Sequence, residues 1–191
     1  HHGLTAYDPT TGLRLWFCKG FVGRGTPTVT PARDLLHVVS GLRGDTYAVR
    51  PGGNGDVTST HMAWHTPRNC SRDLPSPIVL GDQSLVMDMR RATITAYNIR
   101  TGEESWRDRL GDAAVLGQLC ATPVAWNNLA FFVAESGTTY VVQAGTEMKV
   151  VAVNNIDAGP DEIFRASITP SQGQIFLRSD SNLYCIGKRV K

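Results

Sequence analysis

The sequence lacks the long patterns that would place it in several large classes of protein. No apolar run approaches the roughly 20 residues of a membrane-spanning helix, and no segment repeats apolar residues at helical spacing over ten or more positions. Charges of both signs are interspersed and the net charge is only +2. We therefore expect no transmembrane segment, no helical repeat and no nucleic-acid surface, with Arg90-Arg91 and the 188–191 tail as solvated ends.

Cysteine is also scarce. Cys18, Cys70, Cys120 and Cys185 form no CxxC pattern, no adjacent pair and no spacing typical of zinc sites. Cys185 alternates with apolar neighbours in an expected strand, so we predict that it is a small buried hydrophobic residue. Cys70 lies in a polar loop, and we predict that it is exposed. Four such cysteines decide neither the disulfide state nor the redox compartment.

Residues that could bind a metal are few and poorly spaced. The best candidate set is His37, His61 and His65 with Asp45 or Asp56. His61 and His65 would share a face of a helix, but in a strand the same spacing separates them by about 13 Å. Nucleophile signatures such as GxSxG do not occur. We therefore predict neither a metal site nor a catalytic residue.

One stretch of the chain occurs twice. Residues 6–16 read AYDPTTGLRLW and residues 96–106 read AYNIRTGEESW, with every spacing preserved. Each copy is typical of a strand, a tight turn and a return strand. The Asp or Asn closes an Asx-turn, and the glycine takes the left-handed position. We expect the tryptophan of the return strand to fill the gap between neighbouring sheets.

The repeated positions are Ala6, Asp8, Thr11, Gly12 and Trp16 in one copy, and Ala96, Asn98, Thr101, Gly102 and Trp106 in the other. This pattern, AxDxxTGxxxW, resembles the tryptophan docking motif of the pyrroloquinoline quinone (PQQ)-type β-propeller repeat. A third copy keeps Trp64 but lengthens the turn with the glycine-rich residues 51–56, which we expect to form a flexible hairpin tip. In a fourth copy, residues 143–147 replace the turn and Val150-Val151 stands near the tryptophan position, so that blade should dock less firmly.

A second signal recurs at the start of each expected unit, where three of the four openings are Thr-Pro or Ser-Pro. With positions 27, 77, 123 and 167 taken as equivalent, the intervals are 50, 46 and 44 residues. Roughly 40 to 45 residues and four antiparallel strands are typical of a propeller blade. The sequence therefore predicts a repeat of four-stranded blades.

We predict an all-β fold: a partial β-propeller of about four four-stranded antiparallel blades in a single domain spanning 1–191. The expected divisions are a half blade at 1–20, blades at 21–70, 71–115 and 116–160, and an incomplete last blade at 161–191. The resemblance implies the C-terminal part of a seven- or eight-bladed ring. Because the chain enters a strand at once, we expect it to be a C-terminal fragment.

The resemblance implies three candidate roles. The first is a non-catalytic binding or scaffold propeller, similar to the propeller lipoprotein that assists outer-membrane protein assembly. It would bind a protein partner or an unknown ligand at one face of the ring, in a periplasmic or other extracytoplasmic setting, with no cofactor. An extracytoplasmic sensor domain is a further alternative.

A PQQ-dependent quinoprotein dehydrogenase, which would bind PQQ with Ca²⁺, is the remaining role. Such enzymes typically carry a vicinal disulfide, for which this chain has no adjacent cysteines. Its acidic residues are scattered in expected turns and loops, and these are Asp45, Asp56, Asp88, Asp112 and Asp157.

Overall fold

The computed structural model describes residues 3–23, 26–42, 44–68, 75–112 and 116–187. These residues form five small sheets, which we number I to V in sequence order. Sheet I contains β1 (Gly3–Tyr7), β2 (Arg14–Lys19) and β6 (Gly55–Asp56). Sheet II contains β3 (Thr30–Ala32), β4 (Leu35–Val39), β5 (Thr46–Val49) and β7 (Met62–Thr66), and the short helix α1 (Thr58–His61) precedes β7.

The remaining sheets take their strands strictly in sequence order. Sheet III contains β8 (Ile78–Leu80), β9 (Gln83–Asp88), β10 (Thr93–Asn98) and β11 (Glu104–Arg109). Sheet IV contains β12 (Val124–Trp126), β13 (Leu129–Val133), β14 (Thr139–Ala144) and β15 (Met148–Asn154), and sheet V contains β16 (Thr169–Ser171), β17 (Gln174–Arg178) and β18 (Leu183–Ile186). Neighbouring strands of sheets II to V are antiparallel, as expected for short hairpins.

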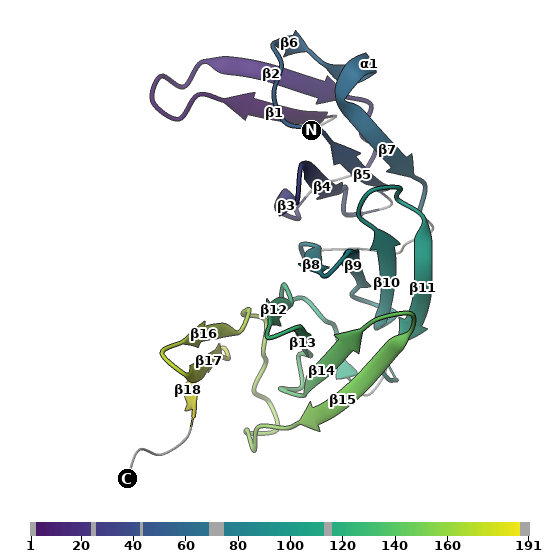
Figure 1. Cartoon of the computed structure of the whole chain (residues 1–191). Helices are drawn as coiled ribbons and strands as arrows, with labels where there is room; N and C mark the ends of the chain where they lie inside the picture. The colour runs from purple at the N-terminus through teal and green to yellow at the C-terminus, as the bar shows by residue number, and fades with distance from the viewer. Residues whose placement is uncertain (1–2, 24–25, 43, 69–74, 113–115, 188–191) are drawn as a thin grey trace.

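The sheets stand one after another along an open arc (Figure 1). Strands β3, β8 and β12 lie on the concave side, and the outer strands β7, β11 and β15 lie on the convex side. Strand β8 contacts both β3 and β12, so the inner strands of sheets II, III and IV form a continuous wall. This radial stack of antiparallel sheets is part of a β-propeller, and the predicted fold class is confirmed.

Hydroxyl side chains connect the inner strands. The Thr28 amide donates to the Ser76 hydroxyl at 2.8 Å, and the Ser76 amide donates to the Thr122 hydroxyl at 3.1 Å. Ser76 and Thr122 each precede a proline that opens an inner strand. The Ser-Pro and Thr-Pro dipeptides therefore link each sheet to the next, because the hydroxyl accepts a backbone hydrogen bond from the preceding sheet.

A register slip at the same place in four sheets positions the outer strands. In three of them an alanine before the slip faces a tryptophan: Ala6 faces Trp16, Ala48 faces Trp64 and Ala96 faces Trp106. In sheet IV the slip follows Val141, whose partner is Ala152. Ala152 therefore occupies the tryptophan position, and the expectation that placed Val150-Val151 there is corrected. The turn of sheet IV is one residue longer than that of sheet III, which moves the register.

The core lies between adjacent sheets. One apolar cluster joins sheets III and IV through fully buried residues such as Leu85 and Phe132. A second joins sheets I and II around Trp16 and Tyr47, and a third joins sheets IV and V around Phe164. No helix in the described part of the chain has the length and apolar character needed to cross a bilayer.

The glycine-rich insertion after β5 folds back onto sheet I. Strand β6 pairs in parallel with β2, so Gly55 lies opposite Trp16. The Val57 amide donates to the Phe17 carbonyl at 2.9 Å, which continues this pairing. The expectation of a flexible hairpin tip is therefore wrong. The insertion instead covers the outer edge of β2, which would otherwise be open to pairing with another strand.

The cysteines differ in exposure. Cys18 in β2 is fully buried, whereas Cys185 in β18 is exposed. The prediction that Cys185 is buried is wrong, because β18 is the last strand in the order of sheet V and its neighbours Leu183 and Ile186 are exposed as well. The prediction for Cys70 falls outside the described residues.

Candidate functional site

Trp64 joins sheet II to sheet III. Its side chain is 8% exposed, and its indole N–H donates to the Ile99 carbonyl at 3.1 Å. Ile99 lies in the turn between β10 and β11, and the indole lies against Gly102 of that turn. A Cβ added at Gly102 would stand 2.5 Å from two indole carbons. The buried His37 ring meets Trp64 edge-on at 4.9 Å, with its Nε2 atom 3.1 Å from the same carbonyl.

The junction between sheets III and IV repeats this contact. The partly buried Trp106 donates its indole N–H to the Gly145 carbonyl at 3.0 Å. Gly145 lies in the turn between β14 and β15, and its carbonyl also accepts from the Gln83 side chain at 2.9 Å. A tryptophan of one sheet thus binds a turn carbonyl of the next sheet at two successive junctions.

The other repeated residues build the turns themselves. Asp8 Oδ1 accepts from the Thr10 and Thr11 amides at 2.8 and 2.9 Å, and the hydrogen bond from the Thr11 amide is the main cause of the lowered pKa of Asp8. Asn98 Oδ1 accepts in the same way from the Arg100 and Thr101 amides. Gly12 and Gly102 have φ angles of 72° and 73°, which glycine adopts without strain.

The junction between sheets IV and V has no indole in this position, because Ala152 replaces it. A pocket of about 370 Å³ lies between the two sheets. Its lining residues are Phe131, Thr139, Asn154, Asn155, Ile156, Ile168, Ile175, Leu177 and Ile186. Phe164 is fully buried at this junction and packs on Gly137, where an added Cβ would lie 2.9 Å from the ring.

Glu135, in the turn between β13 and β14, is the main polar contact across this junction. Arg165 Nε donates to Glu135 Oε1 at 2.6 Å, and the Gln118 amide donates to Oε2 at 3.0 Å. The Glu135 side chain is only 16% exposed. Burial alone would raise the pKa of Glu135, but the hydrogen bonds from Arg165 and Gln118 together hold it below its ordinary value.

A second carboxylate, Glu162, is held by hydrogen bonds in the segment that precedes sheet V. Glu162 accepts hydrogen bonds from the hydroxyls of Ser179 and Tyr184 and from the side-chain amide of Asn182. The hydrogen bond from Ser179 is the main cause of the lowered pKa of Glu162, and the bond to Glu162 raises the pKa of Tyr184. Glu135, Arg165, Glu162 and Tyr184 thus bring four perturbed groups into one region, a pattern that marks candidate functional sites.

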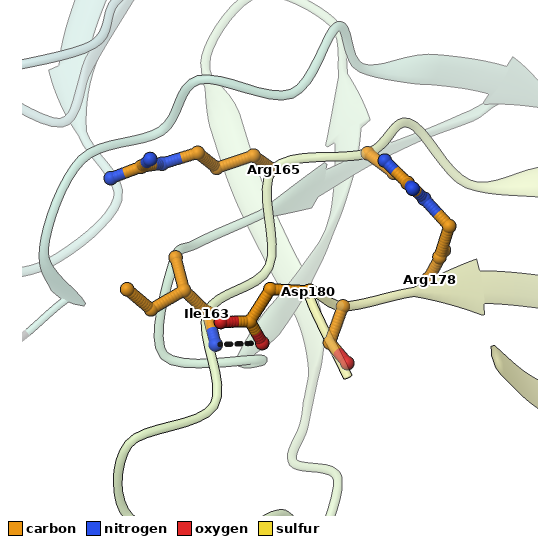
Figure 2. Close-up of a pocket in the computed structure, with 6 residues that line it drawn as sticks. Ile163, Arg165, Arg178 and Asp180 are labelled. Carbon is orange, nitrogen blue, oxygen red and sulfur yellow. Dashed lines mark hydrogen bonds between the residues drawn. The ribbon is translucent and has the colours of Figure 1, made fainter. Parts of the chain in front are cut away.

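A smaller pocket of about 190 Å³ opens beside these carboxylates, and it is lined by Ile163, Arg165, Ala166, Arg178, Ser179 and Asp180. Figure 2 shows Arg165 and Arg178 on opposite sides of Asp180, which accepts a hydrogen bond from the Ile163 amide at 3.2 Å. Arg178 is exposed, and the structure records no ion pair for it with any described residue. The pocket therefore offers a cation and a carboxylate to a ligand. We call Glu135, Glu162, Arg165, Arg178 and Asp180 the IV/V loop site.

In the described part of the chain, the residues considered for a metal or quinone form at most pairs with one another and no larger cluster. Asp45 accepts from the His65 ring at 2.8 Å and from the Arg68 amide, and Asp56 pairs with Lys19. His37 is buried at the Trp64 junction. Within the described ranges, no group of three or more His, Cys, Asp or Glu side chains could hold a metal ion.

The fold and the recurring contact from tryptophan to turn carbonyl define a β-propeller built from PQQ-type repeats. The family model described as outer membrane protein assembly factor BamB matches residues 1–189, and the chain belongs to this family. No curated protein matches the chain in sequence.

Three solved structures show the same fold. BamB from Moraxella catarrhalis has a TM-score of 0.71 and 16% identity, over 97% of this chain and 52% of that one. BBS1N, crystallised in complex with ARL6DN, has a TM-score of 0.67 and 13% identity, over 98% of this chain and 59% of that one. The computationally designed Ika4 protein has a TM-score of 0.64 and 12% identity, over 93% of this chain and all of that one. The chain thus spans about half the length of the BamB structure.

Proposed function

We propose that this chain is a non-catalytic scaffold that binds a protein partner outside the cytoplasm through the IV/V loop site. The family model that matches the chain is described as an outer membrane protein assembly factor. This description supports a scaffold role outside the cytoplasm. The single observation that carries the site is the pocket of Figure 2, where the exposed Arg178 and Asp180 lie beside Arg165, which pairs with the largely buried Glu135.

In this site, hydrogen-bonded loops hold the accessible side chains of Arg178 and Asp180 in place. The Glu135–Arg165 pair and the Glu162 network fix the loops, since each carboxylate accepts at least two hydrogen bonds. Arg178 can donate to a carbonyl or carboxylate of the partner, and Asp180 can accept an amide hydrogen. Loops held on a rigid sheet scaffold are typical positions for binding residues.

A cross-linking experiment tests this site. A photoreactive amino acid placed at position 178 of the full-length protein should cross-link to a partner in cells, and mass spectrometry then identifies that partner. With the purified partner, Arg178→Glu should weaken binding at least tenfold. The matched control is Arg100→Glu, which reverses an exposed arginine in the β10–β11 turn. Equal affinities for both variants would refute the assigned site.

The proposal includes no cofactor and no turnover. The full-length protein can be mixed with PQQ and Ca²⁺ and assayed for alcohol or aldose oxidation with an artificial electron acceptor. Turnover that depends on PQQ would overturn the scaffold role.

A further inference from the structure

We propose that the 370 Å³ pocket between sheets IV and V accepts a tryptophan, or another large aromatic side chain, from an extended segment of the protein partner. This inference rests on the scaffold function proposed above and adds a second contact to it. The occupant is inferred from what the chain places at its other junctions and from the chemistry of the pocket wall.

The first argument is the equivalence of positions. Ala152 pairs with the residue before the register slip, as Trp64 and Trp106 do in sheets II and III. At those two junctions an indole extends toward the next sheet and donates to a turn carbonyl. At the third junction Ala152 carries only a methyl group in this position. Asn154, two residues further along the same face of β15, lines the pocket.

The second argument is complementarity of charge and polarity. None of the nine lining residues carries a charge, and six of them are Ile, Leu or Phe. An uncharged, mostly apolar side chain therefore fits, because a buried charge would lose its hydration without gaining a partner. Thr139, Asn154 and Asn155 supply polar atoms that can bind an indole N–H, which needs a partner when it is buried.

The third argument is continuity with an exposed apolar strip. Val150, Val151 and Val153 of the outer strand β15 are 38%, 42% and 49% exposed, and Ile186 at the pocket is 47% exposed. The outer strand of sheet III is different, since β11 carries charged residues at four of its six positions. An extended segment lying along β15 would cover these valines while its aromatic side chain enters the pocket.

The test uses two synthetic heptapeptides, acetyl-GSTWTSG-amide and the same sequence with Ala in place of Trp. The protein carries labelled isoleucine methyl groups, which are followed by NMR. We expect saturable shifts of Ile156, Ile168, Ile175 and Ile186 with the Trp peptide and at least fivefold weaker binding of the Ala peptide. Shifts confined to other isoleucines, or equal binding of the two peptides, would overturn the proposal.

Two variants test the pocket, one by filling it with an indole and the other by adding a charge to its wall. Ala152→Trp supplies the indole from within the chain, so the peptide shifts should vanish and the melting temperature should rise. Arg109→Trp adds the same ring to an exposed position of β11 in sheet III, away from the pocket and the valine strip, and should keep peptide binding. Ile186→Asp places a carboxylate at a half-exposed position of the wall and should weaken binding about tenfold. Unchanged binding in both Ala152→Trp and Ile186→Asp would overturn the proposal.

The test of the pocket can fail without refuting the scaffold function proposed for the IV/V loop site. If Ala152→Trp and Ile186→Asp both leave peptide binding intact while cross-linking from position 178 still succeeds, the pocket inference fails and the scaffold function stands. If Ala152→Trp abolishes peptide binding and lowers the affinity of the identified partner at least fivefold, the pocket is confirmed as part of the binding surface.

Discussion

Two junctions of the arc are packed differently, the one between sheets II and III and the one between sheets IV and V. The first is filled by Trp64, which binds a turn carbonyl and leaves no room for a side chain at Gly102. The second has Ala152 at that position, a pocket of about 370 Å³ and the Glu135–Arg165 pair at its loop side. The residue at this repeat position thus differs between the junction filled by an indole and the junction that carries the pocket.

This difference has a mechanical consequence. An indole packed on a glycine fixes the distance and angle between two sheets, because neither group can move without opening a void. An ion pair with one exposed partner holds its sheets less tightly, since Arg165 is 61% exposed and water screens the interaction. We expect sheets II to IV to form the rigid part of the scaffold and sheet V to adjust when a partner binds.

Removing the indole should have the largest effect. Trp64→Ala deletes a side chain that is 8% exposed and its hydrogen bond to Ile99. We expect a loss of about 3–5 kcal/mol in the free energy of unfolding, measured by urea denaturation. Trp126→Ala is the control, because Trp126 is 40% exposed and its loss should be much smaller. Similar losses in the two variants would refute the special role of the Trp64 junction.

The glycine under the indole gives the next largest effect. Gly12 and Gly102 occupy the same turn position with nearly equal φ, but only Gly102 has an indole against it. Gly12→Ala should lose about 1 kcal/mol for the left-handed backbone alone. Gly102→Ala should lose about 2 kcal/mol more, because the new methyl group displaces Trp64. Urea denaturation of both variants isolates the contact, and equal losses would show that the indole is free to shift.

The turns and the fold class could be predicted from the sequence because their causes are local. The oxygen of Asp8 bonds amides two and three residues away, and the same spacing recurs at Asn98. Two copies in register then predicted the sheets of a propeller. Register within sheet IV could not be predicted in this way. The lengthened turn moved Ala152 into the place that the valines were expected to fill.

The candidate site depends on contacts between distant parts of the chain. Glu135 and Arg165 are 30 residues apart, and neither lies in a recognisable motif. The only sequence signal for this junction was the missing tryptophan of the fourth copy, which predicted weaker docking but no polar network. The return of β6 to β2 had no local signal either, since it pairs residues 39 positions apart.

The polar contact of the IV/V junction should make a smaller contribution than the indole. Because the folded-state pKa of Glu135 is lowered, its ionised form stabilises the fold above the ordinary carboxyl range, and this stability is lost as pH falls through the folded pKa. Glu135→Gln should lose about 1 kcal/mol at pH 7 and show less decline toward pH 3 than the wild type.

Urea denaturation at both pH values measures this effect. The control is Glu104→Gln, which removes an exposed pair with Arg107 in β11 and should leave the pH dependence close to that of the wild type. A Glu135→Gln protein with the full wild-type decline would show that the Glu135–Arg165 pair does not stabilise this junction.

The contact between the insertion and sheet I should give the smallest effect, because it fastens a single short strand. Asp56 accepts from the Thr58 hydroxyl and pairs with Lys19, and these contacts lower the pKa of Asp56 to about 2. Asp56→Asn should speed hydrogen exchange of the Val57 amide several-fold, since this amide bonds β2, while the melting temperature stays nearly unchanged. The Ile99 amide in sheet III is the internal reference and should exchange at the wild-type rate. Faster exchange at Ile99 as well would mean that β6 supports the whole arc, and the filled junctions would then not be independent of one another.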